Sequence, residues 1–122
     1  MKIVIVDDGP ERCRKIEEAC RTMEIETVVF HDLSSAIEYL EDNEVEAIVT
    51  DRSYPLNNGE KENPDAGHKL LEWLSEHKKE IPVLGNSTMQ FVSNYPYYKG
   101  KMNGYLDMYI FYDFVSSIRN CN

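Results

Sequence analysis

Two short apolar runs in this sequence each end in carboxylates. Asp7 and Asp8 follow the run 3–6, and Asp51 follows the run 47–50. In open α/β sheets ligands bind outside the carboxyl ends of the strands, so the three carboxylates are expected to converge at one edge. Carboxylates that crowd together repel one another unless a cation lies between them, and oxygen ligands suit a hard divalent ion. The sequence therefore predicts a site for a hard divalent ion, although Asp7 and Asp8 acting only as helix caps is an alternative.

The elements that must position these carboxylates alternate along the chain. Apolar patterns predict strands at 2–6, 26–30, 46–50, 81–84 and 103–107. Helices are predicted from Pro10, at 33–42 with Asp32 as cap, at 66–78 with Asp65 as cap, at 87–94, and around 110–118. Arg12 is placed on the solvent face of the first helix, and 56–64 is predicted to be a loop. Five alternations of strand and helix indicate a parallel sheet covered on both faces.

Composition limits the classes of function. The chain has 122 residues with 42% apolar content, which suits a single domain over 1–122. Its net charge of −9 disfavours direct nucleic-acid binding, because phosphate contacts need Lys and Arg. No signal peptide or membrane-spanning run is recognisable, so a cytoplasmic location is expected. Cys13, Cys20 and Cys121 are expected to be reduced thiols without a metal role.

Other residues with chemical potential show no catalytic pattern. His31, His68 and His77 lack ligand spacing and are expected to be solvated on the surface. Tyrosine is dense between residues 95 and 112, and this residue type is favoured where one end is apolar and the other is wet. The pattern predicts a protein-contact surface, with partial packing of these rings as the alternative. The members are Tyr95, Tyr97, Tyr98, Tyr105, Tyr109 and Tyr112.

Taken in order, these features resemble the receiver domain of bacterial two-component response regulators. The likeness runs over about residues 1–120. It rests on the acidic pair after the first strand, the acid that ends the third, and several spaced residues beyond them. These residues are Asp7-Asp8, Asp51, Pro55, Gly67, Pro82, Ser87 and Gly104-Tyr105.

The resemblance implies a flavodoxin-like, doubly wound, five-stranded parallel sheet of order 2-1-3-4-5 with helices on both faces. It implies that Asp51 accepts a phosphoryl group from a histidine kinase or phosphotransfer protein. It further implies that Asp8, Asp51 and the Ser53 carbonyl hold Mg²⁺, with Asp7 acting through water. Ser87 would hydrogen-bond the phosphoryl group or simply cap the next helix. Tyr105 would be a switching aromatic or a half-buried strand residue.

Three departures from the family pattern stand out. The family places Lys-Pro three residues past the aromatic of its fifth strand, where this chain has Met108 and Tyr109. Thr88 follows the switch hydroxyl, where a small residue is usual, and the loop over 56–66 is longer than usual. Lys99 and Lys101 are candidates to replace the missing lysine, with ordinary solvated lysines as the alternative.

The main interpretation is a stand-alone receiver that relays its state by protein contact through residues 87–115, as a monomer or a homodimer. It would not be an enzyme beyond slow self-dephosphorylation. The alternative is a pseudo-receiver, a binding module that keeps the fold but does not switch. A small metal-dependent phosphatase is disfavoured, because position 53 is Ser where such a site needs a second acid.

Overall fold

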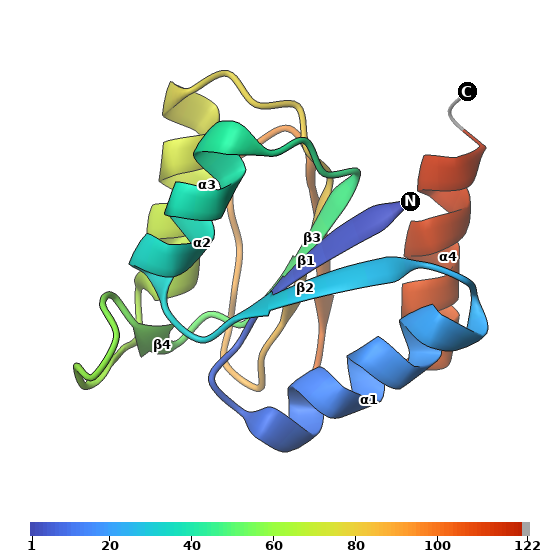
Figure 1. The fold of residues 1–122 in the computed structure, drawn as a ribbon, viewed down its shortest axis with the longest axis horizontal. Helices are drawn as coiled ribbons and strands as arrows, with labels where there is room; N and C mark the ends of the chain where they lie inside the picture. Colours follow the sequence, from blue (N-terminus) through green and yellow to red (C-terminus); the bar gives the residue numbers. More distant parts are fainter. Residues whose placement is uncertain (121–122) are drawn as a thin grey trace.

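The computed structural model describes residues 1–120, in which a five-stranded parallel sheet lies between two layers of helices (Figure 1). The sheet has the order β2-β1-β3-β6-β7, which is 2-1-3-4-5 when only its own strands are counted. This confirms the predicted fold class. In chain order the elements are β1 (Lys2–Val6), α1 (Pro10–Thr22), β2 (Glu26–Phe30), α2 (Leu33–Asp42), β3 (Ala47–Thr50), β4 (Tyr54–Pro55), β5 (Glu62–Asn63), α3 (Ala66–Glu76), β6 (Val83–Asn86), β7 (Tyr98–Met102) and α4 (Met108–Arg119).

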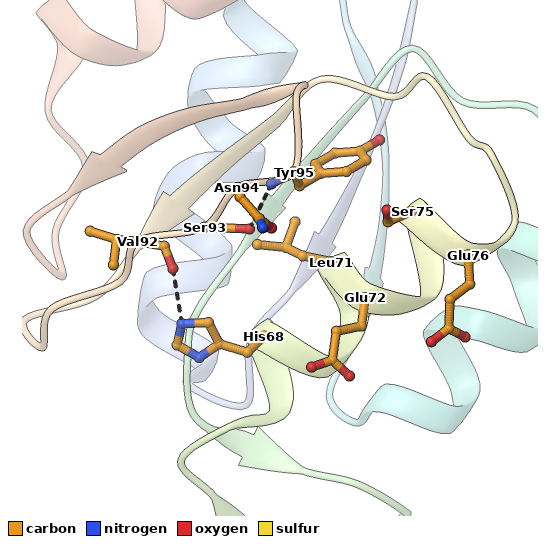
Figure 2. Close-up of a pocket in the computed structure, with 9 residues that line it drawn as sticks. All are labelled: His68, Leu71, Glu72, Ser75, Glu76, Val92, Ser93, Asn94 and Tyr95. Carbon is orange, nitrogen blue, oxygen red and sulfur yellow. Dashed lines mark hydrogen bonds between the residues drawn. The ribbon is translucent and has the colours of Figure 1, made fainter.

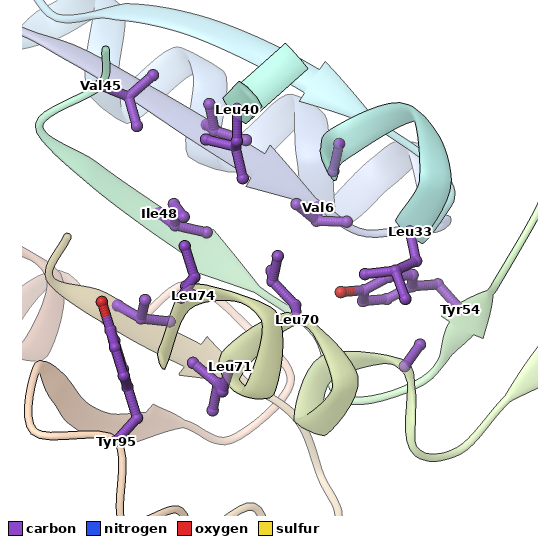
Figure 3. Packing of buried hydrophobic residues seen from close by; sticks show 14 of the residues in the cluster. Val6, Leu33, Leu40, Val45, Ile48, Tyr54, Leu70, Leu71, Leu74 and Tyr95 are labelled. Atoms are coloured by element: carbon purple, nitrogen blue, oxygen red, sulfur yellow. The ribbon is translucent and has the colours of Figure 1, made fainter. Parts of the chain in front are cut away.

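The sheet has an apolar core on each face. Helices α2 and α3 cover one face, where buried side chains interdigitate as shown in Figure 3, among them Val6, Leu40, Ile48, Leu70 and Leu74. Helices α1 and α4 cover the other face, over a cluster that includes Ile3, Ile5, Ile16, Val49 and Phe111. Strands β1 and β3 are buried on both sides, which explains their continuous apolar runs and their reliable prediction.

The first half of the chain agrees closely with the predicted elements. The predicted strands 2–6 and 26–30 and the helix 33–42 have the observed bounds, and Pro10 is the first residue of α1. Asp32 caps α2 by accepting a hydrogen bond from the Ser35 amide at 2.8 Å. Asp65 lies at the N-cap of α3, but its side chain makes no capping hydrogen bond. In this half of the chain, apolar periodicity and helix-start residues are therefore sufficient to predict the bounds of these strands and helices.

The long loop is partly ordered into a hairpin, which corrects the prediction of a loop throughout 56–64. Its residues Glu62 and Asn63 pair with Pro55 and Tyr54 as the antiparallel strands β5 and β4. Arg52, the residue after Asp51, is linked to the end of this hairpin, because its Nε donates a hydrogen bond to the Pro64 carbonyl at 3.0 Å. The same side chain donates through Nη1 to the Gln90 carbonyl at 2.6 Å.

The connection from β6 to β7 departs most from the predictions. Strand β6 occupies 83–86 instead of 81–84, and no helix forms within 87–94. The last strand is 98–102, so the predicted strand 103–107 is wrong.

Side chains hold this connection, over 87–97, in an irregular path. Phe91 is buried with its ring close to Gly67 and Gly85, where an added Cβ would lie 2.8 and 2.9 Å from it. The buried Tyr95 hydroxyl donates to the Ile81 carbonyl at 2.9 Å. Burial of these two rings outweighs the weak local preference for a helix.

Candidate functional site

Three polar side chains form a row across the centre of the sheet at its carboxyl edge. The register pairs Val6 with Thr50 and Thr50 with Gly85. The next residues along the three neighbouring strands are Asp7, Asp51 and Asn86. Side chains alternate between faces, and Ile5, Val49 and Leu84, two residues earlier, all belong to the cluster under α1 and α4. The row therefore lies on the α1 side of the sheet, with Asp51 between Asp7 and Asn86.

The three predicted carboxylates converge as expected. Asp7, Asp8 and Asp51 each offer an oxygen within 4.8 Å of the others. The Asp7 side chain is 2% exposed and that of Asp51 12%. Burial, together with the neighbouring Asp7 charge, raises the pKa of Asp51 to about 6. Burial and the charge of Glu62 also raise the pKa of Asp8. Negative charge at this edge is therefore energetically costly.

Arg12 enters this cluster, which sequence reasoning missed by placing the residue on the solvent face of its helix. Its Nε donates to Asp7 Oδ2 at 3.0 Å, and its Nη2 donates to Asp7 Oδ1 at 2.8 Å. The same Nη2 lies 3.5 Å from Asp51 Oδ2 and 3.8 Å from Asp8 Oδ1. Hydrogen bonding to Asp7 raises the pKa of Arg12 above its usual value, so the guanidinium stays charged. The available signal was the spacing of four residues between Asp8, which precedes the helix, and Arg12 on its first turn.

The oxygen-rich donor set suits a divalent ion, provided that Arg12 yields its contacts. Three carboxylates that approach within 4.8 Å match the hard oxygen ligands preferred by Mg²⁺. Ser53, whose carbonyl is the predicted further ligand, lines the same hollow as Asp51, Arg12 and Glu62. Within residues 1–120, this is the one group of three or more acidic, histidine or cysteine side chains close enough to share an ion.

On the other side of Asp51 lie a hydroxyl and an amide. Ser87 is 4% exposed and lines the hollow; its Oγ accepts a hydrogen bond from the Met89 amide at 3.0 Å, although no helix follows. Asn86 is 1% exposed, and its Oδ1 accepts from the Gly104 amide at 2.8 Å, which fixes the orientation of the carboxamide. Its buried Nδ2 has no hydrogen-bond partner among the described residues. An unpaired buried donor of this kind costs about 1–3 kcal/mol unless a ligand oxygen reaches it.

The observed last strand also changes the place of Met108. Strand β7 ends at Met102, and Gly104 and Met108 both lie beyond it. Gly104 has φ +88° and packs against Thr88, whose Cγ2 would lie 2.6 Å from an added Cβ. Met108 instead begins α4, is 47% exposed and lies beside Lys15 and Met23 of the α1 region. Met108 therefore lies at the start of a helix and not at the end of the last strand, where the prediction of a strand at 103–107 had placed it.

The two candidate replacement lysines make contacts elsewhere. Lys101 Nζ donates to the Ser87 carbonyl at 3.1 Å and to Asn103 Oδ1 at 2.8 Å. Lys99 lines a hollow with Met1 and Glu46, at the opposite end of the sheet from Asp51, so its replacement of the lysine is excluded. Tyr105 lies beyond the strand and is 60% exposed. Arg12, on the α1 side of the sheet, is therefore closer to Asp51 than either Lys99 or Lys101.

The tyrosine-rich segment divides into packed and exposed rings. Tyr95 is 4% exposed, whereas Tyr105 and Tyr112 are 60% and 59% exposed and Tyr109 is 89% exposed. Met89 and Val92, from the irregular connection, add apolar exposure. Packing, the alternative considered for these rings, is therefore observed for Tyr95, whereas the exposed rings offer apolar contact area for another protein.

A second hollow lies between α3 and residues 92–95, away from the acidic cluster (Figure 2). The His68 ring contacts the Val92 carbonyl through Nε2 at 3.2 Å, and Glu72 and Glu76 line the same surface. His31 and His77 are exposed, as predicted, and each contacts a backbone carbonyl through Nδ1 at 2.9 Å.

Cys13 and Cys20 are free, buried thiols, and burial raises the pKa of both. The third predicted thiol, Cys121, lies outside the described residues.

Comparison with known proteins supports the fold. No protein-family model matches the sequence, and no curated protein matches it. Solved structures of response regulator receiver domains do match across nearly the whole chain. A receiver domain from a Francisella response regulator aligns with 17% identity and a TM-score of 0.79, covering 99% of this chain and 98% of that one. This protein therefore has the receiver-domain fold.

Two further structures are similar over the same range. A two-component response regulator from Clostridium difficile shows 18% identity and a TM-score of 0.76, covering 100% of this chain and 98% of that one. The response regulator TrrA from Thermotoga maritima, in complex with Mg²⁺ and BeF, shows 13% identity and a TM-score of 0.76, covering 96% of this chain and 97% of that one.

No helix within residues 1–120 is long and apolar enough to cross a membrane.

Proposed function

We propose that this protein is a receiver module of two-component signalling in which Asp51 accepts a phosphoryl group from a partner's phosphohistidine. The observation that carries the proposal is the row of Asp7, Asp51 and Asn86. Asp51 stands at the carboxyl end of the central strand β3, with carboxylates that could hold a metal ion on one side and an unpaired buried donor on the other. This arrangement offers partners for both the negative charge and the oxygens of a transferred phosphoryl group.

Only one oxygen of the acceptor is engaged by the backbone. Asp51 Oδ1 accepts a hydrogen bond from the Arg52 amide at 2.7 Å, which holds the carboxylate in place and leaves Oδ2 facing Arg12. Oδ2 would form the new P–O bond while the P–N bond of the phosphohistidine breaks and the imidazole takes up a proton. Asp8, Asp51 and the Ser53 carbonyl would hold Mg²⁺, with Asp7 acting through water. The ion would neutralise charge that develops on the phosphoryl oxygens.

The transferred group would then be held from the β6 side. Asn86 would donate its Nδ2 hydrogens to one phosphoryl oxygen, since this buried donor has no acceptor within residues 1–120. Ser87 would donate from its hydroxyl to another, and the ring of Tyr105 would respond to that contact. Asn86 was not among the residues selected from the sequence, because an isolated amide at a strand end has no distinguishing pattern.

The expected partners follow from this chemistry. A histidine kinase or a phosphotransfer protein would supply the phosphoryl group. A downstream protein would bind the exposed tyrosines and apolar side chains within residues 87–115, as an alternative to pairing with a second copy of this chain. With its net charge of −9, the domain would not bind nucleic acid directly and would work in the cytoplasm.

The test is incubation with a small acyl phosphate and Mg²⁺, followed by the mass of the intact protein. Wild type should gain the mass of one phosphoryl group, and the Asp51→Asn variant should gain none. An unmodified wild type, with its fold verified by circular dichroism, would contradict phosphoryl acceptance.

The second candidate is a receiver-like interaction module that does not switch. Arg12 favours it, since its guanidinium already contacts all three carboxylates. The missing family lysine also favours it, since Met108 stands where the resemblance places that lysine. In the same experiment, this candidate predicts an unmodified protein that still binds its partner through the tyrosine-rich surface.

A further inference from the structure

The carboxylate cluster already has a counter-ion, and that counter-ion belongs to the chain. The Arg12 guanidinium makes two hydrogen bonds to Asp7 and lies 3.5 Å from Asp51 and 3.8 Å from Asp8. These are the same three side chains that could share a metal ion. We propose that Arg12 is a tethered cation that occupies the metal position, and that a divalent ion binds only when Arg12 withdraws from Asp8 and Asp51.

The backbone provides space for this guanidinium at Gly9. A Cβ added to Gly9 would lie 2.5 Å from Arg12 Cζ and 2.5 Å from its Nη2, so the guanidinium would have to shift. Gly9 has φ −89° and ψ 108°, an extended conformation open to any residue, so backbone freedom does not require glycine here. What the position requires is close approach, because the planar guanidinium lies against the Cα of Gly9.

Electrostatics makes the two cations mutually exclusive. A divalent ion bound between Asp8 and Asp51 would lie close to a guanidinium that is 3.5 Å from Asp51, and like charges at such a distance repel strongly in a partly buried site. Arg12 is 39% exposed, so its side chain has room to turn toward solvent. Asp7 would keep the hydrogen bond from the Gly9 amide at 2.8 Å.

The proposal gives the pocket two states. With Arg12 inside, the carboxylates are neutralised without metal; with Arg12 outside, they are free to hold the ion that assists phosphoryl transfer. This consequence for signalling rests on the proposed function, whereas the competition itself does not. Since Arg12 is on the first turn of α1, exchange between the states alters the surface at α1.

The competition is tested by isothermal titration of the purified protein with Mn²⁺, with Mg²⁺ as a second probe. The Arg12→Gln variant should bind Mn²⁺ at least about tenfold more tightly than wild type, because apparent affinity falls with the fraction of molecules in the binding-competent state. Gly9→Ala should also bind more tightly, since it displaces the guanidinium while keeping every charge of the protein.

Arg14→Gln is the matched control for charge. It removes one guanidinium from the same helix, but Arg14 pairs with Glu11 and Glu18 on the exposed face. Its Mn²⁺ affinity should stay within about twofold of wild type, because exposed charges act weakly through solvent.

The measured Mn²⁺ affinities decide whether Arg12 competes with the metal ion. Equal affinity in Arg12→Gln and wild type would overturn the proposal, and so would an equal gain in Arg12→Gln and Arg14→Gln. If Arg12→Gln does not fold, Gly9→Ala alone decides: a gain supports the competition and no gain contradicts it. Failure of Asp51 to accept a phosphoryl group would leave these affinities unchanged, so the proposed function and the competition fail in different experiments.

Discussion

The connections on either side of Asp51 are built differently. The β1–α1 connection at 7–9 is three residues long and holds two carboxylates against Arg12 through short polar contacts. The β6–β7 connection at 87–97 is irregular and is held by the buried rings of Phe91 and Tyr95. The connection at 7–9 is therefore held by contacts between charged groups, whereas the connection at 87–97 is held by the burial of apolar rings.

This difference indicates where a change at Asp51 is felt. The first helical turn of α1 carries the only guanidinium or ammonium group found within 4 Å of the Asp51 carboxylate in residues 1–120. On the β6 side, the neighbours Asn86 and Ser87 carry no charge, and the cation Lys101 is engaged with the Ser87 carbonyl. A charge added to Asp51 should therefore affect α1 most strongly, through Arg12. Residues 87–105 should respond less, because they would contact the added group only through hydrogen bonds from uncharged side chains.

The apolar side gives the largest expected effect. Phe91 is 2% exposed and packs against His68 and Tyr98 with ring centroids 4.9 and 5.2 Å apart. Phe91→Ala should lower the free energy of unfolding by about 3–4 kcal/mol, since it leaves a cavity beneath the connection. Urea denaturation measures the change, with the exposed neighbour Val92→Ala as control. A loss below about 1 kcal/mol would mean that ring burial does not hold this segment.

The charged groups around Asp51 should make the stability of the fold depend on pH. The pKa of Asp51 is raised to about 6 in the fold, above the ordinary value of 3.8. Its contribution to stability is therefore fully present below about pH 4 and is lost as the pH rises through about 6. The loss amounts to about 2–3 kcal/mol, from about 1.4 kcal/mol per pKa unit.

Asp51→Asn should abolish this loss and be more stable than wild type at pH 7.5 without metal, by about 1–2 kcal/mol. Thermal melts between pH 4 and 8 measure both effects, with the exposed Asp113→Asn as control. Saturating Mg²⁺ should shrink the difference at pH 7.5. Parallel pH profiles for wild type and Asp51→Asn would show that Asp51 ionises in the fold as freely as in water.

Asn86 tests the uncharged side of the pocket at a smaller scale. Asn86→Asp keeps an oxygen to accept from the Gly104 amide but replaces the unpaired Nδ2 donor. Binding of beryllofluoride with Mg²⁺, followed by fluorine NMR, should weaken about tenfold, as expected for the loss of a hydrogen bond to a charged ligand. Asn103→Asp adds the same charge nearby and should weaken binding less. Equal losses would assign the effect to charge alone.

The smallest effect is expected at Met108. From the sequence alone, Met108→Lys would restore part of the lysine's coupling, but Met108 starts α4 and does not line the Asp51 hollow. The substitution should therefore leave beryllofluoride-induced amide shifts within 86–105 unchanged. Enlarged shifts in Met108→Lys would contradict the register of β7 described above.

Sequence reasoning succeeded where local signals and burial agree. Strands β1 and β3 are buried on both faces, so their apolar runs and terminal carboxylates were sufficient to predict the sheet and the convergence of Asp7, Asp8 and Asp51. Strand β7 was misplaced because it is an edge strand with a mixed sequence, and Gly104-Tyr105 matched a family pattern more closely than the true strand did.

The contents of the pocket were harder to predict. Helical periodicity assigns a face to the Cα of Arg12, but its long side chain turns back over Gly9 to reach Asp7. Asn86 was missed because its position beside Asp51 follows from the pairing of neighbouring strands, which a single sequence does not show. Both residues depend on tertiary placement and not on any local pattern.

The two hydrogen bonds from Arg52 have a mechanical consequence. This side chain follows Asp51 directly and links the carbonyl of Pro64 in the hairpin connection to the carbonyl of Gln90 in the β6–β7 connection. The two loops that border the pocket are thus joined by one side chain, which is attached to the backbone directly after Asp51. Opening one loop strains the other, so their backbone amides should exchange with solvent as one unit.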